Sequence, residues 1–156
     1  MSTSPTGAPE ALPPDAVIMQ LLFGKTMFFS VTAVARLGIA DHLSEIPRDV
    51  EDIARDTATH APSLYRVLRL LVSVGVFREG PPRHFALNPA AQLLQSGHSR
   101  SLRDMAIMFA DPWVLRSYAR LDQCLRTGTD GVTLEFGKHV FDLFHDIPDQ
   151  AANFHR

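Results

Sequence analysis

The chain has 156 residues, of which 46% are hydrophobic and 21% charged, and its formal net charge is −2. This composition is typical of one globular domain, with or without an extension, and the balanced charge excludes a general electrostatic attraction to nucleic acid or to an anionic membrane. The single cysteine, Cys124, excludes an internal disulfide and a multi-cysteine metal site, so we expect a reducing, cytoplasmic setting.

The N-terminal segment is small, polar and rich in proline. It lacks the basic and then apolar pattern of a secretory signal peptide. We therefore predict a disordered leader over residues 1–14.

A long apolar helix is predicted next, over Ala16–Leu37. Its only charged residues are Lys25 and Arg36, and its apolar side chains point in nearly every direction, so it must be buried on several sides or inserted in lipid. Polar residues interrupt the run at short intervals, which favours contact with a partner chain and its own core over a membrane span. Gly24 marks a position where the helix could break, and Gly38 is placed to close it.

Two helices joined by a short turn follow. Asp49 is placed to cap the first helix. The second, Ser63–Val74, repeats its apolar residues at the i, i+3, i+4, i+7 spacing. These residues are Leu64, Val67, Leu68, Leu71 and Val72. Gly75 ends this helix, and residues 76–79 and 83–87 then form two short strands around a Gly-Pro-Pro turn, which completes a predicted winged-helix unit.

Short helices are predicted after this wing. Asn88 is placed to cap a helix over Pro89–Leu94, which ends near Gly97. Ser101 and Asp104 have the spacing of a capping box, which would open the next helix.

The last third of the chain is also predicted to be helical. A longer helix begins at Pro112 and closes at Gly128, and one stripe on it consists of Val114, Tyr118, Leu121 and Leu125. A loop, a helix near Val140–His145 and a helix opening at Pro148 follow. Because the chain stops inside this last helix, we expect that it was cut there.

Signatures of nucleotide binding and of serine nucleophiles are missing from the sequence. No two of the nine glycines are separated by a single residue, so no GxGxxG loop can be written, and no P-loop is present. Strands do not alternate with helices after Leu87, which excludes a Rossmann domain in this chain. We therefore predict neither a cofactor site nor a catalytic residue within these residues.

The seven histidines raise the question of a metal site. His139, Asp142 and Asp146 would share one face of a helix. A solvated polar face has the same spacing, and no second pair of ligands is evident, so we predict no metal.

DNA binding by the helix-turn-helix is an alternative to a scaffold role. The side chains available to read bases or to bind phosphate are Ser63, Tyr65, Arg66, Arg69, Arg78 and Arg83. The acidic residues close by in the sequence are Asp49, Glu51, Asp52, Asp56 and Glu79. They cancel the arginine charges, so the scaffold interpretation is favoured.

A cluster of methionines and aromatic residues has two interpretations. It comprises Met105, Met108, Phe109, Trp113 and Tyr118. Such residues at helical spacing form a protein core, and they also line adaptable pockets for flat organic ligands.

Several stretches resemble, in their order and spacing, the N-terminal part of a known family. They are GKTMFFSVTAVARLGIADHL, VEDIARDTATHAPSLYRVLRLLVSVGVF, FALNPAAQLL, LDQCLRTG, FGKHVFDLF and DQAANFHR. The family is that of the bacterial and plant-type S-adenosylmethionine-dependent small-molecule O-methyltransferases. The resemblance covers nearly the whole chain from Asp15 onward.

The resemblance implies a mainly α, winged-helix-like dimerisation domain with a small β-hairpin wing that does not bind DNA. It also implies an intertwined homodimer, for which we expect interface residues at Met19, Leu22, Phe23, Phe28, Phe29 and Val31. An aromatic or polyketide-like acceptor would lie between this domain and a Rossmann-like domain. The residues of suitable type and place for its wall are Met27, Phe28, Met105, Met108, Phe109 and Trp113.

Residues 15–97 are thus expected to form the dimerisation helix and winged-helix unit, and residues 98–156 a helical extension leading toward a catalytic domain that the chain lacks. In a complete enzyme, S-adenosylmethionine would methylate an ionised hydroxyl that a histidine deprotonates. The cofactor residues and that histidine lie outside the chain, which alone is expected to be inactive. The alternatives are a winged-helix transcription regulator and a stand-alone dimerisation subunit of a separate catalytic chain.

Overall fold

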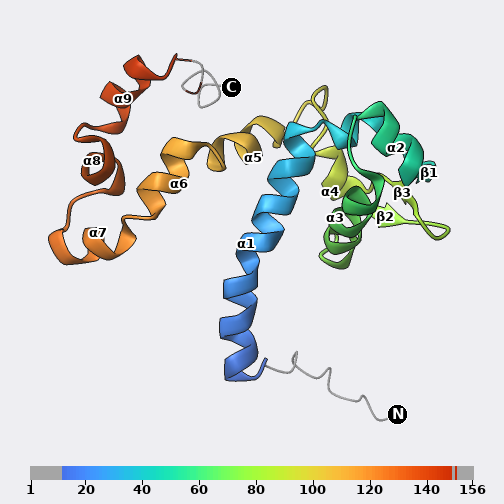
Figure 1. The fold of residues 1–156 in the computed structure, drawn as a ribbon, viewed down its shortest axis with the longest axis horizontal. Coiled ribbons are helices and arrows are strands. Elements are labelled where there is room, and N and C mark those ends of the chain that lie inside the picture. Colours follow the sequence, from blue (N-terminus) through green and yellow to red (C-terminus); the bar gives the residue numbers. More distant parts are fainter. Residues whose placement is uncertain (1–11, 149, 151–156) are drawn as a thin grey trace, which may run out of the picture.

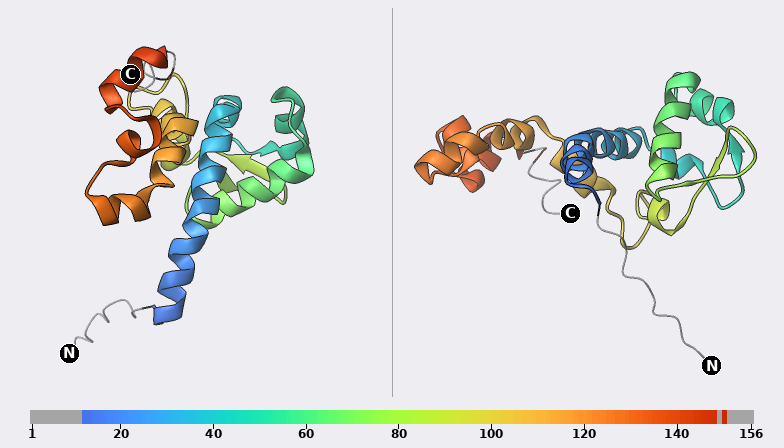
Figure 2. Two further views of the ribbon diagram at one scale, coloured as in Figure 1. Left: turned by 60° about the vertical axis from the view of Figure 1, so that its left-hand side comes forward. Right: turned by 90° about the horizontal axis from the view of Figure 1, so that it is seen from below.

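The computed structural model describes residues 12–148 and residue 150. Helix α1 (Pro14–Arg36) stands at the centre of the molecule (Figure 1). A winged-helix body lies on one side of its C-terminal half, and a succession of short helices, the helical arm, lies on the other side (Figure 2). Most of the predicted leader and of the helix predicted from Pro148 lies outside the described residues.

The body runs from η1 to α4. Its elements are η1 (Ile39–His42), β1 (Arg48–Asp49), α2 (Val50–Asp56), α3 (Ala61–Ser73), β2 (Arg78–Glu79), β3 (His84–Ala86) and α4 (Pro89–Gln92). The strands form one antiparallel sheet in the order β1-β3-β2, with Asp49 opposite His84 and Arg78 opposite Ala86. This arrangement confirms the predicted mainly helical, winged-helix-like fold. Strand β1 was not predicted, because two residues carry no strand pattern of their own and only the pairing with β3 defines them.

The core of the body brings together side chains from α1, η1, α2, α3 and the sheet. Its largest fully buried members are Phe85, Ile39, Ile53, Leu68, Leu71, Val34 and Val50. Val34 comes from α1, so the last turns of that helix belong to the same core. The apolar stripe predicted on α3 faces this core, since Leu64 is buried as well and Val67 and Val72 pack against it partly buried.

Side-chain caps fix where the body helices begin. The carboxylate of Asp49 accepts a hydrogen bond from the backbone N–H of Glu51 at 2.7 Å, which starts α2 as predicted. The amide of Asn88 accepts from the N–H of Ala91 at 2.9 Å and donates to the carbonyls of Gly75 and Phe77. Asn88 therefore joins the start of α4 to the segment that follows α3.

Helix α1 is continuous, and the break considered at Gly24 does not occur. A glycine within a helix costs about 1 kcal/mol relative to alanine, which is small beside the many good helix formers on either side. The helix ends at Arg36, and Gly38 takes the left-handed conformation with φ +65°, which glycine adopts without strain.

The arm differs from its prediction in two places. Its elements are α5 (Arg103–Phe109), α6 (Pro112–Tyr118), α7 (Leu121–Thr127), α8 (Gly131–Phe136) and α9 (Val140–Asp146). The single long helix predicted up to Gly128 is wrong, because the chain turns at Ala119 and Arg120 and divides it into α6 and α7. The predicted loop contains α8, which packs across α6.

The capping box predicted at the start of α5 is also only partly present. The hydroxyl of Ser101 accepts a hydrogen bond from the N–H of Arg103 at 3.2 Å, but Leu102 occupies the N-cap position.

Candidate functional site

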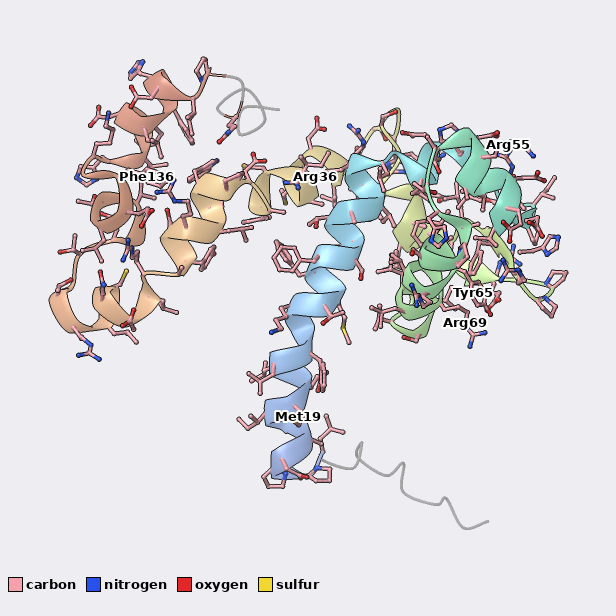
Figure 3. All side chains as sticks on the ribbon, in the orientation of Figure 1. Met19, Arg36, Arg55, Tyr65, Arg69 and Phe136 are labelled. Carbon is pink, nitrogen blue, oxygen red and sulfur yellow. The ribbon has the colours of Figure 1, made fainter. Side chains whose placement is uncertain are left out.

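The N-terminal two thirds of α1 carries a large exposed apolar surface, which we call the α1 surface. Its members are Val17, Ile18, Met19, Leu21, Leu22, Phe23 and Phe29. Leu21 is 72% exposed and Phe23 is 56% exposed, although both lie within a regular helix. Figure 3 shows Met19 on the part of α1 that extends away from both the body and the arm. Apolar surface of this extent on a soluble domain indicates contact with another molecule.

The residues predicted for a dimer interface fall into two groups. Met19, Leu22, Phe23 and Phe29 belong to the α1 surface, whereas Phe28 and Val31 are half-buried. The rings of Phe28 and Phe29 meet edge to face at 5.1 Å. Val31 packs against the core of its own body. The prediction did not include Val17, Ile18 and Leu21, although the same apolar run contains them.

Helix α1 also has the length and the apolar composition of a helix that crosses a membrane. Core helices of soluble proteins pass the same test. The last turns of α1 pack on the body and on α5, so at least this part of the helix is a packing element of the domain.

A cavity of about 430 Å³ opens in the arm, where the end of α5, α6, α7 and the start of α8 meet. This volume lies within the range of small-molecule pockets. The lining residues are Met108, Phe109, Trp113, Val114, Ser117, Tyr118, Leu121, Cys124, Asp130, Gly131 and Val132. Tyr118 is 66% exposed, so a flat aromatic wall is open to solvent along one side.

Half of the predicted acceptor wall lines this cavity. Met108, Phe109 and Trp113 are lining residues. Met105 is exposed on α5, and Met27 and Phe28 are half-buried on α1, and none of these three belongs to the lining. The wall contributed by α7 and α8 was missed, because its residues become neighbours only through the turn after α6.

Two polar side chains of the cavity, Ser117 and Asp130, are engaged within the protein, whereas the indole N–H of Trp113 is buried without a hydrogen-bond partner among the described residues. The hydroxyl of Ser117 donates to the carbonyl of Trp113 at 2.7 Å. The carboxylate of Asp130 caps α8, accepting from the hydroxyl of Thr133 at 2.7 Å and from its N–H at 2.9 Å, and these bonds lower the pKa of Asp130 below its ordinary value. The cavity therefore favours an apolar aromatic ligand over a strongly charged one.

Close packing and ion pairs hold α8 across α6 and so maintain the cavity. Arg116 Nε and Arg120 Nε donate to the two oxygens of Glu135 at 2.7 and 2.6 Å. Hydrogen bonds from these two arginines, Arg120 first, lower the pKa of Glu135. A Cβ atom on Gly131 would lie 2.4 Å from the carbonyl oxygen of Ser117, so only glycine permits this approach of α8 to α6.

The arginines considered for DNA binding lie on α3 and on the wing, and most of them contact other residues of the body. Arg69 of α3 lies 3.1 Å from Glu79 and, in Figure 3, close to Tyr65. Arg83, in the turn between β2 and β3, pairs with Glu51, and its guanidinium lies 4.8 Å from the ring centre of Tyr65. Arg78 donates to the carbonyl of Glu45 at 2.7 Å. Arg69, Arg78 and Arg83 are thus engaged by other residues of the body, whereas the one printed contact of Arg66 is a hydrogen bond of 3.4 Å to the hydroxyl of Ser63.

Within the described residues, no group of three or more histidine, cysteine, aspartate or glutamate side chains is placed to hold a metal ion. Asp146, a member of the metal candidate considered above, pairs with Lys138 at 2.5 Å.

The family follows from residues 19–97, which match the model of the O-methyltransferase dimerisation domain. The chain belongs to this family. The match includes the C-terminal part of α1 and the whole body, so the resemblance seen in the sequence is confirmed.

Individual relatives agree with the family model. The chain is 35% identical, over 92% of its length, to phenazine O-methyltransferase PhzM of Lysobacter antibioticus, and 37% identical, over 74% of its length, to 8-amino-8-demethylriboflavin N,N-dimethyltransferase of Streptomyces davaonensis. It covers 42% and 33% of these two proteins. The structure of CalO1, a methyltransferase of calicheamicin biosynthesis with SAH bound, superposes with a TM-score of 0.79 at 27% identity, over 93% of this chain and 44% of that one. The chain thus spans about two fifths of the length of such proteins.

Proposed function

We propose that this chain is the dimerisation and substrate-pocket domain of an S-adenosylmethionine-dependent O-methyltransferase that acts on an aromatic or polyketide-like natural product. The observation that carries the proposal is the aromatic-lined cavity of the arm, which lies on the same fold as methyltransferases named for a phenazine and for a riboflavin analogue. Phenazine and the flavin ring system are flat and tricyclic, and a wall of Met, Trp, Tyr and Leu suits such a shape.

Homodimer formation is the first part of this function. The α1 surface is contiguous along one helix and is too apolar to remain in water, because each Å² of apolar area buried contributes about 25 cal/mol. We place the interface at Met19, Leu22, Phe23, Phe28, Phe29 and Val31. Polar residues interrupt the α1 surface, and their burial in lipid would be unfavourable. A second copy of the chain therefore covers this surface better than a membrane does.

Acceptor binding is the second part. Met108, Phe109 and Trp113 form the inner wall of the cavity. We place Met105, Met27 and Phe28 on the outer part of the same acceptor site, where a second domain or a second copy completes it. The reaction would transfer the methyl group of S-adenosylmethionine to an ionised acceptor hydroxyl, and this chain contributes binding and orientation while cofactor and proton transfer belong to a further domain.

The proposed division of labour follows the elements. Residues 15–97 would supply the dimer contacts, and residues 98–156 would supply the cavity and lead toward the catalytic domain. A cytoplasmic protein without nucleic-acid or membrane partners is consistent with the ion pairs of Arg69 on α3 and Arg83 on the wing, and with the interrupted apolar run of α1.

Light scattering tests the dimer. The purified chain should have twice the monomer mass, and Phe23→Asp should convert it to a monomer, because an unpaired charge buried in an apolar interface costs several kcal/mol. Ala90→Asp is a matched control, since Ala90 is exposed in the first turn of α4, where a carboxylate is tolerated. A monomeric wild-type chain would contradict the interface.

Ligand binding tests the cavity. Trp113 is the only tryptophan of the chain, so quenching of its emission by 1-hydroxyphenazine, a neutral tricyclic phenol, reports binding directly. Removal of the Tyr118 ring by Tyr118→Ala should weaken the affinity about tenfold, as expected for loss of one stacking partner. Phe141→Ala, which removes an exposed ring outside the lining, should not. Absence of binding at millimolar ligand would contradict the proposal.

A further inference from the structure

The C-terminal end of α1 meets the start of α6 in a set of polar contacts around Arg36 (Figure 3). Arg36 Nη2 donates to the carbonyl of Ala110 at 2.8 Å and to that of Ile107 at 3.5 Å. It also lies 3.5 Å from Asp111 Oδ1. The last carbonyls of a helix have no partner within the helix. The side chain of Arg36 therefore caps the C-terminal end of α5 and at the same time contacts Asp111, the N-cap residue of α6.

A second arginine ties the same helices in the opposite direction. Arg103, in the first turn of α5, donates from Nε to the carbonyl of Ala35 at 3.0 Å. The two ends of α5 are therefore both fixed to the last turn of α1. We call Arg36, Arg103, Ala110 and Asp111 the Arg36 joint.

Asp111 is an unusual N-cap residue. Its side chain makes no capping hydrogen bond to α6, although an aspartate cap typically contributes about 1 kcal/mol. Instead, Oδ1 faces Arg36, and Oδ2 is buried without a hydrogen-bond partner among the described residues. The residue is only 8% exposed. A carboxylate oxygen in such a place requires an explanation, because it weakens the fold.

The charge of Asp111 is disfavoured where it lies. Burial raises the pKa of Asp111 above its ordinary value of 3.8, and the nearby charge of Arg36 offsets this only in part. The charged side chains of α5 and of the last two turns of α1 are Arg36, Arg103 and Asp104, and Arg36 is the one whose charge acts on Asp111. Ionised Asp111 therefore reduces stability at neutral pH, while the neutral form does not.

We propose that Asp111 is a positioning residue, whose carboxylate holds Arg36 so that the first turn of α6, and with it the Trp113 wall of the cavity, keeps a fixed orientation relative to α1. It acts through Arg36 and the backbone of α6 without touching the acceptor. The contact between Arg36 and Asp111 thereby connects the dimerisation helix α1 to the wall of the acceptor cavity. The role of the cavity rests on the proposed function, whereas the connection between the helices does not.

Trp113 is the natural reporter of this connection. It follows Asp111 by two residues, lines the cavity, and meets the ring of Phe144 edge to face at 5.4 Å. As the only tryptophan, it reports the state of this turn without labelling.

The test compares Asp111→Asn with the wild-type chain by acrylamide quenching of Trp113. The substitution keeps the shape and removes the charge, so the quenching constant should rise about threefold at pH 7, as expected for loss of one ion-paired contact. The melting temperature should not fall, because the buried charge is removed as well. In the wild type, quenching should increase as the pH falls through the titration of Asp111. In the variant this increase should be absent, which leaves only the separate acid response expected from Glu135.

Variants elsewhere separate this role from general loosening. Arg36→Gln should reproduce the increased quenching. Arg126→Gln and Asp122→Asn remove an arginine from the last turn and an aspartate from the first turn of α7, and both should leave quenching unchanged. Unchanged quenching in Asp111→Asn, or a rise accompanied by a lower melting temperature, would overturn the proposal.

A ligand measurement connects the joint to the cavity. The affinity for 1-hydroxyphenazine should fall about threefold in Asp111→Asn, by the same loosening of the wall. If the wild type binds no phenazine but quenching responds as described, the proposed function fails and the positioning role stands. If binding and quenching are the same in both proteins, the positioning role fails and the proposed function stands.

Discussion

The body and the arm lie on either side of α1 and are stabilised in different ways. The body gathers its apolar side chains into one core around Phe85, which is completely buried. In the arm, α5, α7 and α8 contain no fully buried residue, and Leu125 and Tyr118 are 82% and 66% exposed. Ion pairs, one close glycine contact and the edge-to-face contact of Trp113 with the buried Phe144 hold the arm together. The body has the features of a unit that folds by itself, and the arm those of a surface that another molecule covers.

The largest expected effect is in the body. Phe85→Ala removes the central ring of the core and its edge-to-face contact with Tyr65, and it should lower the free energy of unfolding by about 3–5 kcal/mol in urea denaturation. Phe141→Ala, which truncates an exposed ring of the arm, should change it by less than about 0.5 kcal/mol. Equal losses in the two variants would show that body and arm share one cooperative core.

A smaller and local effect is expected at the contact between α8 and α6. Gly131→Ala places a methyl group against the carbonyl of Ser117, and the resulting shift should cost about 1–3 kcal/mol. Hydrogen exchange should accelerate in α6 and α8 and remain unchanged in α3. Gly97→Ala is the control, since nothing lies within 4 Å of an added Cβ there. If hydrogen exchange accelerated equally throughout the body, the stability of the arm would not be independent of that of the body.

The acid response of the arm gives a third comparison. Arg120 and Arg116 lower the pKa of Glu135, so its contribution to stability is present above the ordinary value of 4.5 and is lost as the pH falls through the lowered pKa. Trp113 emission should therefore change in that acid range, and Glu135→Gln should remove this dependence while loosening the arm at pH 7. Asp142→Asn, on the exposed side of α9, should retain the wild-type profile.

The smallest effect is expected at the most exposed apolar side chain of the arm. Leu125→Ala should change the stability of the isolated chain by no more than about 0.5 kcal/mol, because the side chain is already in water. A larger loss that grows with protein concentration would place Leu125 in the dimer interface, in addition to the α1 surface.

The body was predictable because its determinants are local. The caps at Asp49 and Asn88, the left-handed Gly38 and the apolar spacing of α3 each depend on residues within a turn of one another. Strand β1 escaped prediction, since its two residues are defined only by pairing with β3.

The arm was less predictable because its contacts join residues far apart along the chain. A continuous apolar stripe from Val114 to Leu125 predicted one helix, and the turn at Ala119 and Arg120 arises where Arg120 reaches Glu135 of α8. Four members of the aromatic cluster, Met108, Phe109, Trp113 and Tyr118, line the cavity. The cavity walls that α7 and α8 contribute depend on that turn, and no local sequence pattern predicts the turn.

The shape of the sheet limits how copies of this chain can associate. Its edge strands, β1 and β2, have two residues each, so they offer almost no backbone for another strand to extend. The exposed apolar area of the described residues lies on helices instead, chiefly on α1 and the arm. Helix packing between two identical surfaces closes after one partner and saturates, whereas strand addition continues without limit. A domain with this much uncovered apolar surface is thus directed toward a finite assembly and away from fibrous growth.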